Sequence, residues 1–148
     1  AGHGNAMCLR YFNVYGPGEN EAGDYSTVIR RFRTLRLQGK PLTIYGDGEQ
    51  RRDFTFVDDV ARANVLALTT TIGGYRILNI GAGANVSVNE VAAIIGGPTI
   101  HLPPRPSEAR VTQADPARAA RLLGWRPVVS FEDAVMGLLR EDDREGKP

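Results

Sequence analysis

The sequence predicts an α/β fold, and three features of the chain support this prediction. Residues 7–15 and 75–80 are strongly apolar runs, as is typical of inner strands of parallel sheets, which are buried on both faces. Residues 28–37 and 60–68 carry apolar side chains at roughly helical spacing. Ser, Asp or Gly residues flank such segments where helix caps are expected.

Composition is that of an ordinary globular protein. The chain has 148 residues, of which 42% are hydrophobic and 24% are charged, enough for one domain with a core. The net charge is +1 and the arginines are scattered, so we expect no nucleic-acid partner. No apolar run approaches the roughly 18 residues of a membrane span, so we expect no membrane segment and a cytoplasmic location.

Metal and thiol chemistry have little support. Cys8 is the single cysteine, which excludes an internal disulfide and a cysteine-based zinc site. Because Cys8 lies in an apolar run, we expect a buried, inert thiol. The two histidines, His3 and His101, cannot build a histidine-rich site, so the sequence predicts no metal.

The first strand contains one polar misfit, Asn13, and ends at the turn 16–18. A buried Asn must be satisfied, or it must lie at the carboxyl end of a strand, where ligands bind in open α/β sheets. No initiating Met precedes this strand, so we expect the chain to be part of a longer protein.

A helix is predicted next, from an N-cap at Ser26 to a stop at Gly39. Residues 42–45 then alternate as in a short strand. We expect the arginines of the helix to form a solvated face: Arg30, Arg31, Arg33 and Arg36.

The middle of the chain combines a glycine turn, an arginine pair, a strand and a helix. Arg51 and Arg52 precede the predicted strand 54–57, and Asp58 is the expected N-cap of a helix that ends near Thr70. An arginine fixed at the edge of such a unit can hold a phosphate bidentately. The alternative is a pair of solvated arginines.

The strand 75–80 runs into the glycine-containing turn 81–85. A dinucleotide fingerprint would need a third glycine, but position 86 is Val86. Ser87 and Glu90 form a capping-box pattern that explains the helix start without a ligand. We therefore interpret these glycines as a structural turn.

The last third of the chain begins with the predicted strand 99–102, in which we expect His101 to be packed. Three prolines surround Arg105 in residues 103–108, which stiffens the backbone around a residue able to meet a ligand. Two helices follow, one capped at Asp115-Pro116 and one at Ser130. We expect a charged, frayed tail at 141–148.

Seven motifs stand in order along the chain, at residues 9–17, 42–48, 52–54, 57–60, 79–81, 104–106 and 122–125. This series, which opens Leu-Arg-Tyr-Phe-Asn, closely resembles the carboxyl-terminal half of sugar-nucleotide epimerases and dehydratases. Those enzymes are extended short-chain dehydrogenases/reductases. The form of the first motif is more similar to 4-epimerases than to dehydratases.

The resemblance implies a doubly wound NAD domain with a small substrate-binding lid. Residues 7–15 and 75–80 would be late strands of the cofactor-domain sheet. Residues 16–57 would form the first part of the lid, and 84–130 most of the rest. Residues 1–148 would thus be the carboxyl-terminal part of the larger fold.

The resemblance also assigns substrate contacts. Asn13, Arg52 and Arg105 match family residues that contact the nucleotide diphosphate. Glu108 stands where the family usually has an Asp that contacts the ribose, and Tyr45 matches the segment beside the base. The family's Val-Ile-Pro-Arg-Phe motif is here Val-Ile-Arg-Arg-Phe at residues 28–32, and its Arg-Pro-Gly-Asp motif is Arg-Pro-Ser-Glu at residues 105–108. The base and ribose contacts are therefore less secure than the diphosphate contacts.

The family's catalytic pair is missing. Epimerisation uses a Tyr-x-x-x-Lys pair, but the lysines of this chain are Lys40 and Lys147, and the residues four positions earlier are Arg36 and Asp143. The chain also lacks the glycine fingerprint that seats the pyrophosphate of NAD. By resemblance NAD would be bound mainly by an amino-terminal half, with Tyr11 near the nicotinamide end.

The sequence therefore predicts the substrate-binding half of an NAD-dependent nucleotide-sugar epimerase that acts on a UDP-hexose, without catalytic residues of its own. The alternatives are a non-catalytic nucleotide-sugar binding or assembly module and a dehydratase of the same family. We also expect self-association, because strands without sheet neighbours invite pairing with another chain.

Overall fold

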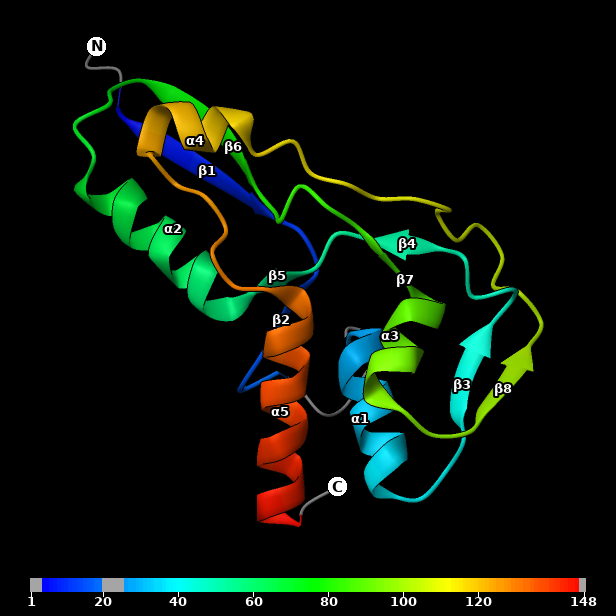
Figure 1. Ribbon diagram of the computed structural model, residues 1–148. Helices are drawn as coiled ribbons and strands as arrows, with labels where there is room; N and C mark the ends of the chain where they lie inside the picture. The colour runs from blue at the N-terminus through cyan, green and yellow to red at the C-terminus, as the bar shows by residue number, and fades with distance from the viewer. Residues whose placement is uncertain (1–3, 20–25, 147–148) are drawn as a thin grey trace.

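The computed structural model describes residues 4–19 and 26–146, so His3 and Lys147 lie outside the described residues. Its helices are α1 (Val28–Leu37), α2 (Val57–Thr69), α3 (Val88–Ile95), α4 (Ala117–Leu123) and α5 (Phe131–Glu145). Its strands are β1 (Ala6–Tyr11), β2 (Val14–Tyr15), β3 (Leu42–Tyr45), β4 (Arg51–Arg52), β5 (Thr55–Phe56), β6 (Tyr75–Ile80), β7 (Val86–Ser87) and β8 (Thr99–Leu102). Figure 1 shows their arrangement.

The strands form two-stranded units, most of them parallel. β1 pairs with β6, β2 with β5 and β3 with β8, each in parallel, whereas β4 and β7 are antiparallel. Parallel pairs require long crossover connections, which the helices supply. The predicted α/β class is therefore confirmed.

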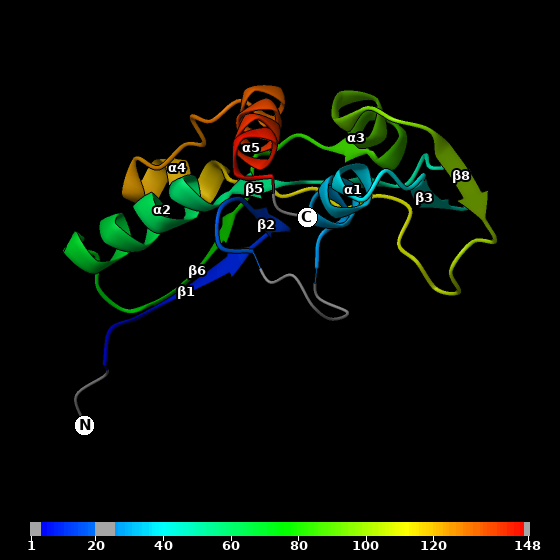
Figure 2. The ribbon, with the colours of Figure 1, turned by 90° about the horizontal axis from the view of Figure 1, so that it is seen from below.

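Two hydrophobic cores organise the structure. One lies between β1, β6, α2 and α4 and includes Leu78, Ile80 and Trp125, which are fully buried. The other lies between β3, α1, α3 and α5 and includes Phe32 and Val91. Figure 2 shows α2 and α4 above the β1–β6 pair and α5 between the two groups of elements.

The prediction of a single strand over residues 7–15, buried on both faces, is wrong. β1 ends at Tyr11, β2 begins at Val14, and Asn13 between them has a positive φ of 30°. One face of β1 packs against the helical core through Met7 and Leu9. Alternate strand residues point to the opposite face, so the Cys8 thiol is exposed rather than buried.

The arginine face of α1 is less solvated than predicted. Arg33 is buried, and its guanidinium donates to both carboxylate oxygens of Asp142 on α5, from Nε at 2.7 Å and from Nη2 at 2.6 Å. The predicted frayed tail is also wrong for residues 141–145, because α5 remains helical to Glu145. The local sequence pattern could not predict the ion pair, because its two residues are 109 positions apart in the chain.

Three helix starts differ from the predicted caps by one or two residues. Thr27, not Ser26, caps α1 by accepting a hydrogen bond from Arg30 N–H. α2 begins at Val57 without a side-chain cap, so Asp58 lies in its first turn. The neighbouring carboxylate of Asp59 is buried and instead accepts from the N–H groups of residues 128 and 129.

At α4 the N-cap is Pro116, while the Asp115 carboxylate accepts from Ala117 N–H. The capping box of Ser87 and Glu90 is confirmed, as is the cap at Ser130. Such caps are predictable because they involve contacts only three residues apart.

His101 is exposed rather than packed, because every residue of β8 is solvent-accessible. Its Nδ1 lies 2.8 Å from the carbonyl oxygen of Gly46. Among the described residues, no helix is long and apolar enough to cross a membrane.

Candidate nucleotide-binding cleft

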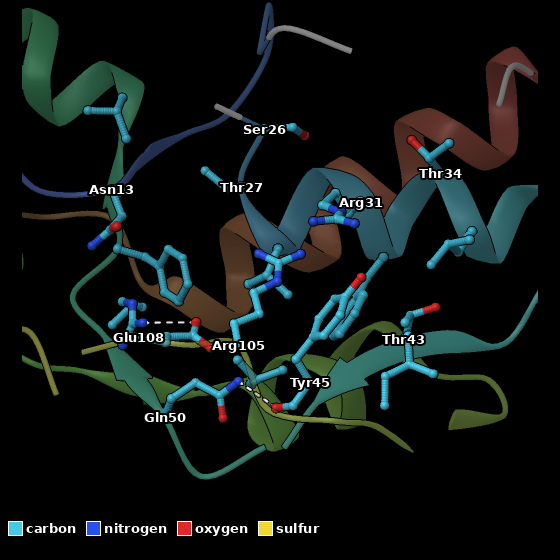
Figure 3. A pocket seen from close by; sticks show the side chains of 18 residues that line it. Asn13, Ser26, Thr27, Arg31, Thr34, Thr43, Tyr45, Gln50, Arg105 and Glu108 are labelled. Atoms are coloured by element: carbon cyan, nitrogen blue, oxygen red, sulfur yellow. Dashed lines mark hydrogen bonds and ion pairs between the residues drawn. The ribbon is translucent and has the colours of Figure 1, made fainter. Parts of the chain in front are cut away.

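A cleft of about 1090 Å³ opens between α1, β3 and the loop 103–108. Figure 3 shows its lining side chains, which come from segments far apart in the sequence. The polar and charged lining residues are Asn13, Ser26, Thr27, Arg31, Thr34, Thr43, Tyr45, Gln50, Arg52, Arg105 and Glu108. Five residues that the resemblance assigns to the substrate thus line one cleft.

Asn13 lies just beyond the carboxyl end of β1 in a conformation that few non-glycine residues adopt. Its Nδ2 donates to the carbonyl oxygen of Asp53 at 2.6 Å, and its own carbonyl accepts from Thr55 N–H at 3.2 Å. These two bonds hold the backbone turn in place. The residue remains exposed at the cleft, which suits the carboxyl end of a strand in an α/β sheet.

Arg52 is held by backbone carbonyls on one side of its guanidinium. Nη1 donates to the carbonyl oxygens of Arg51 at 2.9 Å and Ala109 at 2.7 Å. Nη2 donates to Oε1 of Glu108 at 3.0 Å. The guanidinium therefore has a fixed orientation at the wall of the cleft.

Arg105 stacks on the ring of Tyr45, with Cζ 3.9 Å from the ring centroid, which is close enough for a cation–π interaction. A hydrogen bond with Arg105 is the main cause that lowers the pKa of the Tyr45 hydroxyl, and Arg31 acts in the same direction. Figure 3 shows these side chains together on one side of the cleft.

Arg31 was missed as a cleft residue, since the helical pattern placed it on a solvated face. The signal was available in the motif at residues 28–32, whose fourth position is arginine both here and in the family pattern. Gln50 was also missed. It is buried and donates from Nε2 to the carbonyl oxygen of Tyr45 at 3.0 Å, which supports the end of β3.

Asp53 supports the cleft from behind. Its side chain is fully buried, and its carboxylate accepts from the backbone N–H groups of Ala82, Gly83 and Ala114 at 2.7 to 2.9 Å. The Asp53 carboxylate therefore occupies the N–H donors of the glycine turn that an external anion would otherwise use. The turn does not fit the pyrophosphate of a dinucleotide, because two of its donors are already used.

The charge of the cleft favours an anion. The charged lining residues that the structure describes are three arginines, Arg31, Arg52 and Arg105, and one carboxylate, Glu108. These described residues give an excess of two positive charges. Arginine forks bind phosphate oxygens with bidentate geometry. A ligand with two phosphate charges matches this arrangement.

Two other expectations concern sites outside the cleft. Tyr11 does not line it; its hydroxyl donates to Oδ1 of Asn64 on α2 at 2.8 Å. Within residues 4–19 and 26–146, no cluster of three or more His, Cys, Asp or Glu side chains could hold a metal ion.

Comparison with known proteins establishes the family. Residues 1–81 match the model of the NAD dependent epimerase/dehydratase family, and the chain belongs to this family. Among its relatives are a UDP-glucuronate 4-epimerase of Thermodesulfobacterium geofontis, 37% identical over 86% of this chain and 40% of the relative, and a UDP-glucose 4-epimerase of Mycolicibacterium smegmatis, 37% identical over 83% and 41%.

Solved structures of 4-epimerases also match this chain. The crystal structure of a UDP-glucose 4-epimerase from Thermotoga maritima with UDP-glucose matches with a TM-score of 0.85 and 34% identity, covering 94% of this chain and 46% of that one. A UDP-glucuronic acid 4-epimerase from Bacillus cereus, in complex with UDP-glucuronic acid and NAD, matches with a TM-score of 0.82 and 34% identity over 93% and 45%. The chain thus spans less than half the length of these proteins.

Proposed function

We propose that this chain is the substrate-binding half of an NAD-dependent nucleotide-sugar epimerase and grips the diphosphate of a UDP-hexose. The observation that carries the proposal is the convergence of Asn13, Arg52 and Arg105 on one cleft, whose described lining residues have an excess of two positive charges. A nucleotide sugar has two phosphate charges, so its diphosphate would neutralise the cleft. The relatives that match most of this chain support the substrate class.

The five cleft residues that the resemblance assigns to the substrate each have a role in this proposal. The fork of Arg52, oriented by the Ala109 carbonyl, would bind one phosphate, and Arg105 would bind the other from its proline-rich loop. Asn13 would donate to the diphosphate from the end of β1. Tyr45 would lie beside the base, and Glu108 would accept from the ribose.

Positioning is the contribution of these residues to catalysis. Binding energy realised on a remote diphosphate can orient the sugar for reaction. NAD, when bound, supplies the hydride acceptor for the sugar carbon. Residues 7–15 and 75–80 would belong to the sheet of the cofactor domain, with Tyr11 toward the nicotinamide, while 16–57 and most of 84–130 would form the lid.

Removal of either diphosphate arginine weakens binding. We expect Arg52→Ala and Arg105→Ala each to lower the affinity for UDP by about 1.5–3 kcal/mol, because each removes a charge-assisted hydrogen bond. Lys should restore only part of the affinity, since it lacks the planar fork. Titration calorimetry measures the effect.

The matched control is Arg110→Ala. This variant also removes one arginine, but Arg110 pairs with Asp47 on the surface and does not line the cleft. It should bind UDP as the unmodified chain does. Unchanged UDP affinity in both the Arg52 and Arg105 variants would contradict the assignment.

The isolated chain should not epimerise UDP-glucose. It has no Tyr-x-x-x-Lys pair, and its glycine turn is bonded to Asp53 rather than open to NAD. UDP should still raise the melting temperature, because a ligand that binds only the folded state stabilises it. Turnover of UDP-glucose with NAD that follows the chain through purification would show that other residues carry the chemistry.

The second candidate is a non-catalytic nucleotide-sugar binding or assembly module, which would keep Asn13, Arg52 and Arg105 but have no turnover. A dehydratase of the same family would use the same diphosphate grip. The size of the protein in its source cells discriminates between an enzyme and a module. A product about twice as long as this chain, like the matched structures, supports the epimerase.

Self-association is also part of the proposal, because one edge of β1 has no paired strand among the described residues. We expect the isolated chain to form dimers or larger species through exposed strand edges. Light scattering that gives a clean monomer mass at high concentration would count against this expectation.

A further inference from the structure

Arg52 and Glu108 form an ion pair inside the cleft. The distance from Nη2 to Oε1 is 3.0 Å, and the side chains are 18% and 30% exposed. The other terminal nitrogen of Arg52 is occupied by the carbonyl oxygens of residues 51 and 109. The Glu108 carboxylate therefore stands at the donor that Arg52 turns toward the cleft.

This carboxylate is in the place where an anionic ligand would bind Arg52. Among the described residues that line the cleft, it is also the single negative charge. A phosphate that approaches Arg52 must displace Glu108 or share its donor, and the two like charges repel each other at short range. Glu108 therefore opposes the binding of any anion that offers the carboxylate no new partner.

We propose that Glu108 is a specificity-determining residue, an internal anion that Arg52 releases only to ligands that also bind the carboxylate. Ribose hydroxyls can donate to a carboxylate, so a nucleoside diphosphate offers Glu108 new hydrogen bonds in place of the one from Arg52 that it loses. Inorganic pyrophosphate carries the same phosphate chemistry but has no hydroxyl donors. The cleft thus selects nucleoside diphosphates over free phosphates. This inference rests on the proposed function, because it assumes that the cleft binds a diphosphate.

The test compares UDP with inorganic pyrophosphate in titration calorimetry, using the unmodified chain and Glu108→Gln. The amide retains the size of the side chain and removes its charge. We expect pyrophosphate to bind about fivefold more tightly to the variant, the equivalent of a partly exposed ion pair. UDP affinity should change less, so the selectivity for UDP over pyrophosphate falls.

The control is Asp143→Asn, which removes one carboxylate from a surface ion pair with Arg36, outside the cleft. It alters the net charge by the same amount and should leave the selectivity unchanged. An equal gain in pyrophosphate affinity in this variant would mean that net charge, not Glu108, is responsible. Thermal unfolding of each variant verifies that it is folded.

The outcomes separate the two proposals. If UDP binds but pyrophosphate affinity is the same in both proteins, the role of Glu108 is refuted and the proposed function stands. If UDP binds neither protein while pyrophosphate binding strengthens in the variant, the proposed substrate and the selection of nucleoside diphosphates are both wrong, and only the opposition of Glu108 to free phosphates stands. Binding of neither probe by either protein overturns both.

Discussion

Asp142→Ala should lower the free energy of unfolding by about 3–5 kcal/mol, because it leaves the buried guanidinium of Arg33 without its counter-ion. The side chains of the pair are only 6% and 9% exposed, and two hydrogen bonds join them. The pair fixes α5 against α1, whose other face lines the cleft. Urea unfolding followed by circular dichroism measures the loss.

Asp143→Ala is the matched control, since the adjacent carboxylate pairs with Arg36 at the surface. Exposed pairs contribute at most about 1 kcal/mol, so this variant should remain close to the unmodified chain. The double substitution of Arg33 and Asp142 by Met and Leu should recover much of the stability, because apolar residues can replace a buried ion pair. Similar losses in Asp142→Ala and Asp143→Ala would show that the buried pair has no special role.

Asp53→Asn should destabilise the chain by about 3 kcal/mol or more, since hydrogen bonds to a charged acceptor contribute roughly 1.5–3 kcal/mol each. The carboxylate accepts from three backbone N–H groups, and the amide nitrogen of Asn would face at least one of them as a second donor. For a chain of this size, the melting temperature should fall by about 10 °C.

The comparison variant is Asp115→Asn. Asp115 is exposed and accepts a single backbone hydrogen bond from Ala117, so its replacement should cost below about 1 kcal/mol. Calorimetric melting of both variants tests the difference. A melting temperature for Asp53→Asn within a degree or two of the unmodified chain would mean that the three donors find other acceptors.

Local features were the most predictable part of the fold. The cap at Ser87 and the glycine stop after α1 depend on residues within a few positions, so their chemistry is visible in the sequence. The burial of Arg33 was not predictable, because its partner is distant in the chain. Cys8 was misplaced because an apolar run alone does not show which strand face is covered.

The cleft was predictable only as a set of residues. Resemblance to a family named Asn13, Arg52, Arg105, Tyr45 and Glu108, and the structure places all five in one cleft; their contacts with a ligand remain predictions. The ion pair between Arg52 and Glu108 and the stack of Arg105 on Tyr45 depend on side-chain directions in two separate loops. No sequence pattern encodes such directions.

The anchoring of Arg52 by the Ala109 carbonyl also constrains when the cleft can form during synthesis. Arg52 leaves the ribosome 57 residues before the carbonyl that orients it, and domains fold as units while the chain is made. A nascent chain that stops before residue 109 therefore carries the arginine without its anchor. Ligand binding during translation would begin only after the proline-rich loop has emerged.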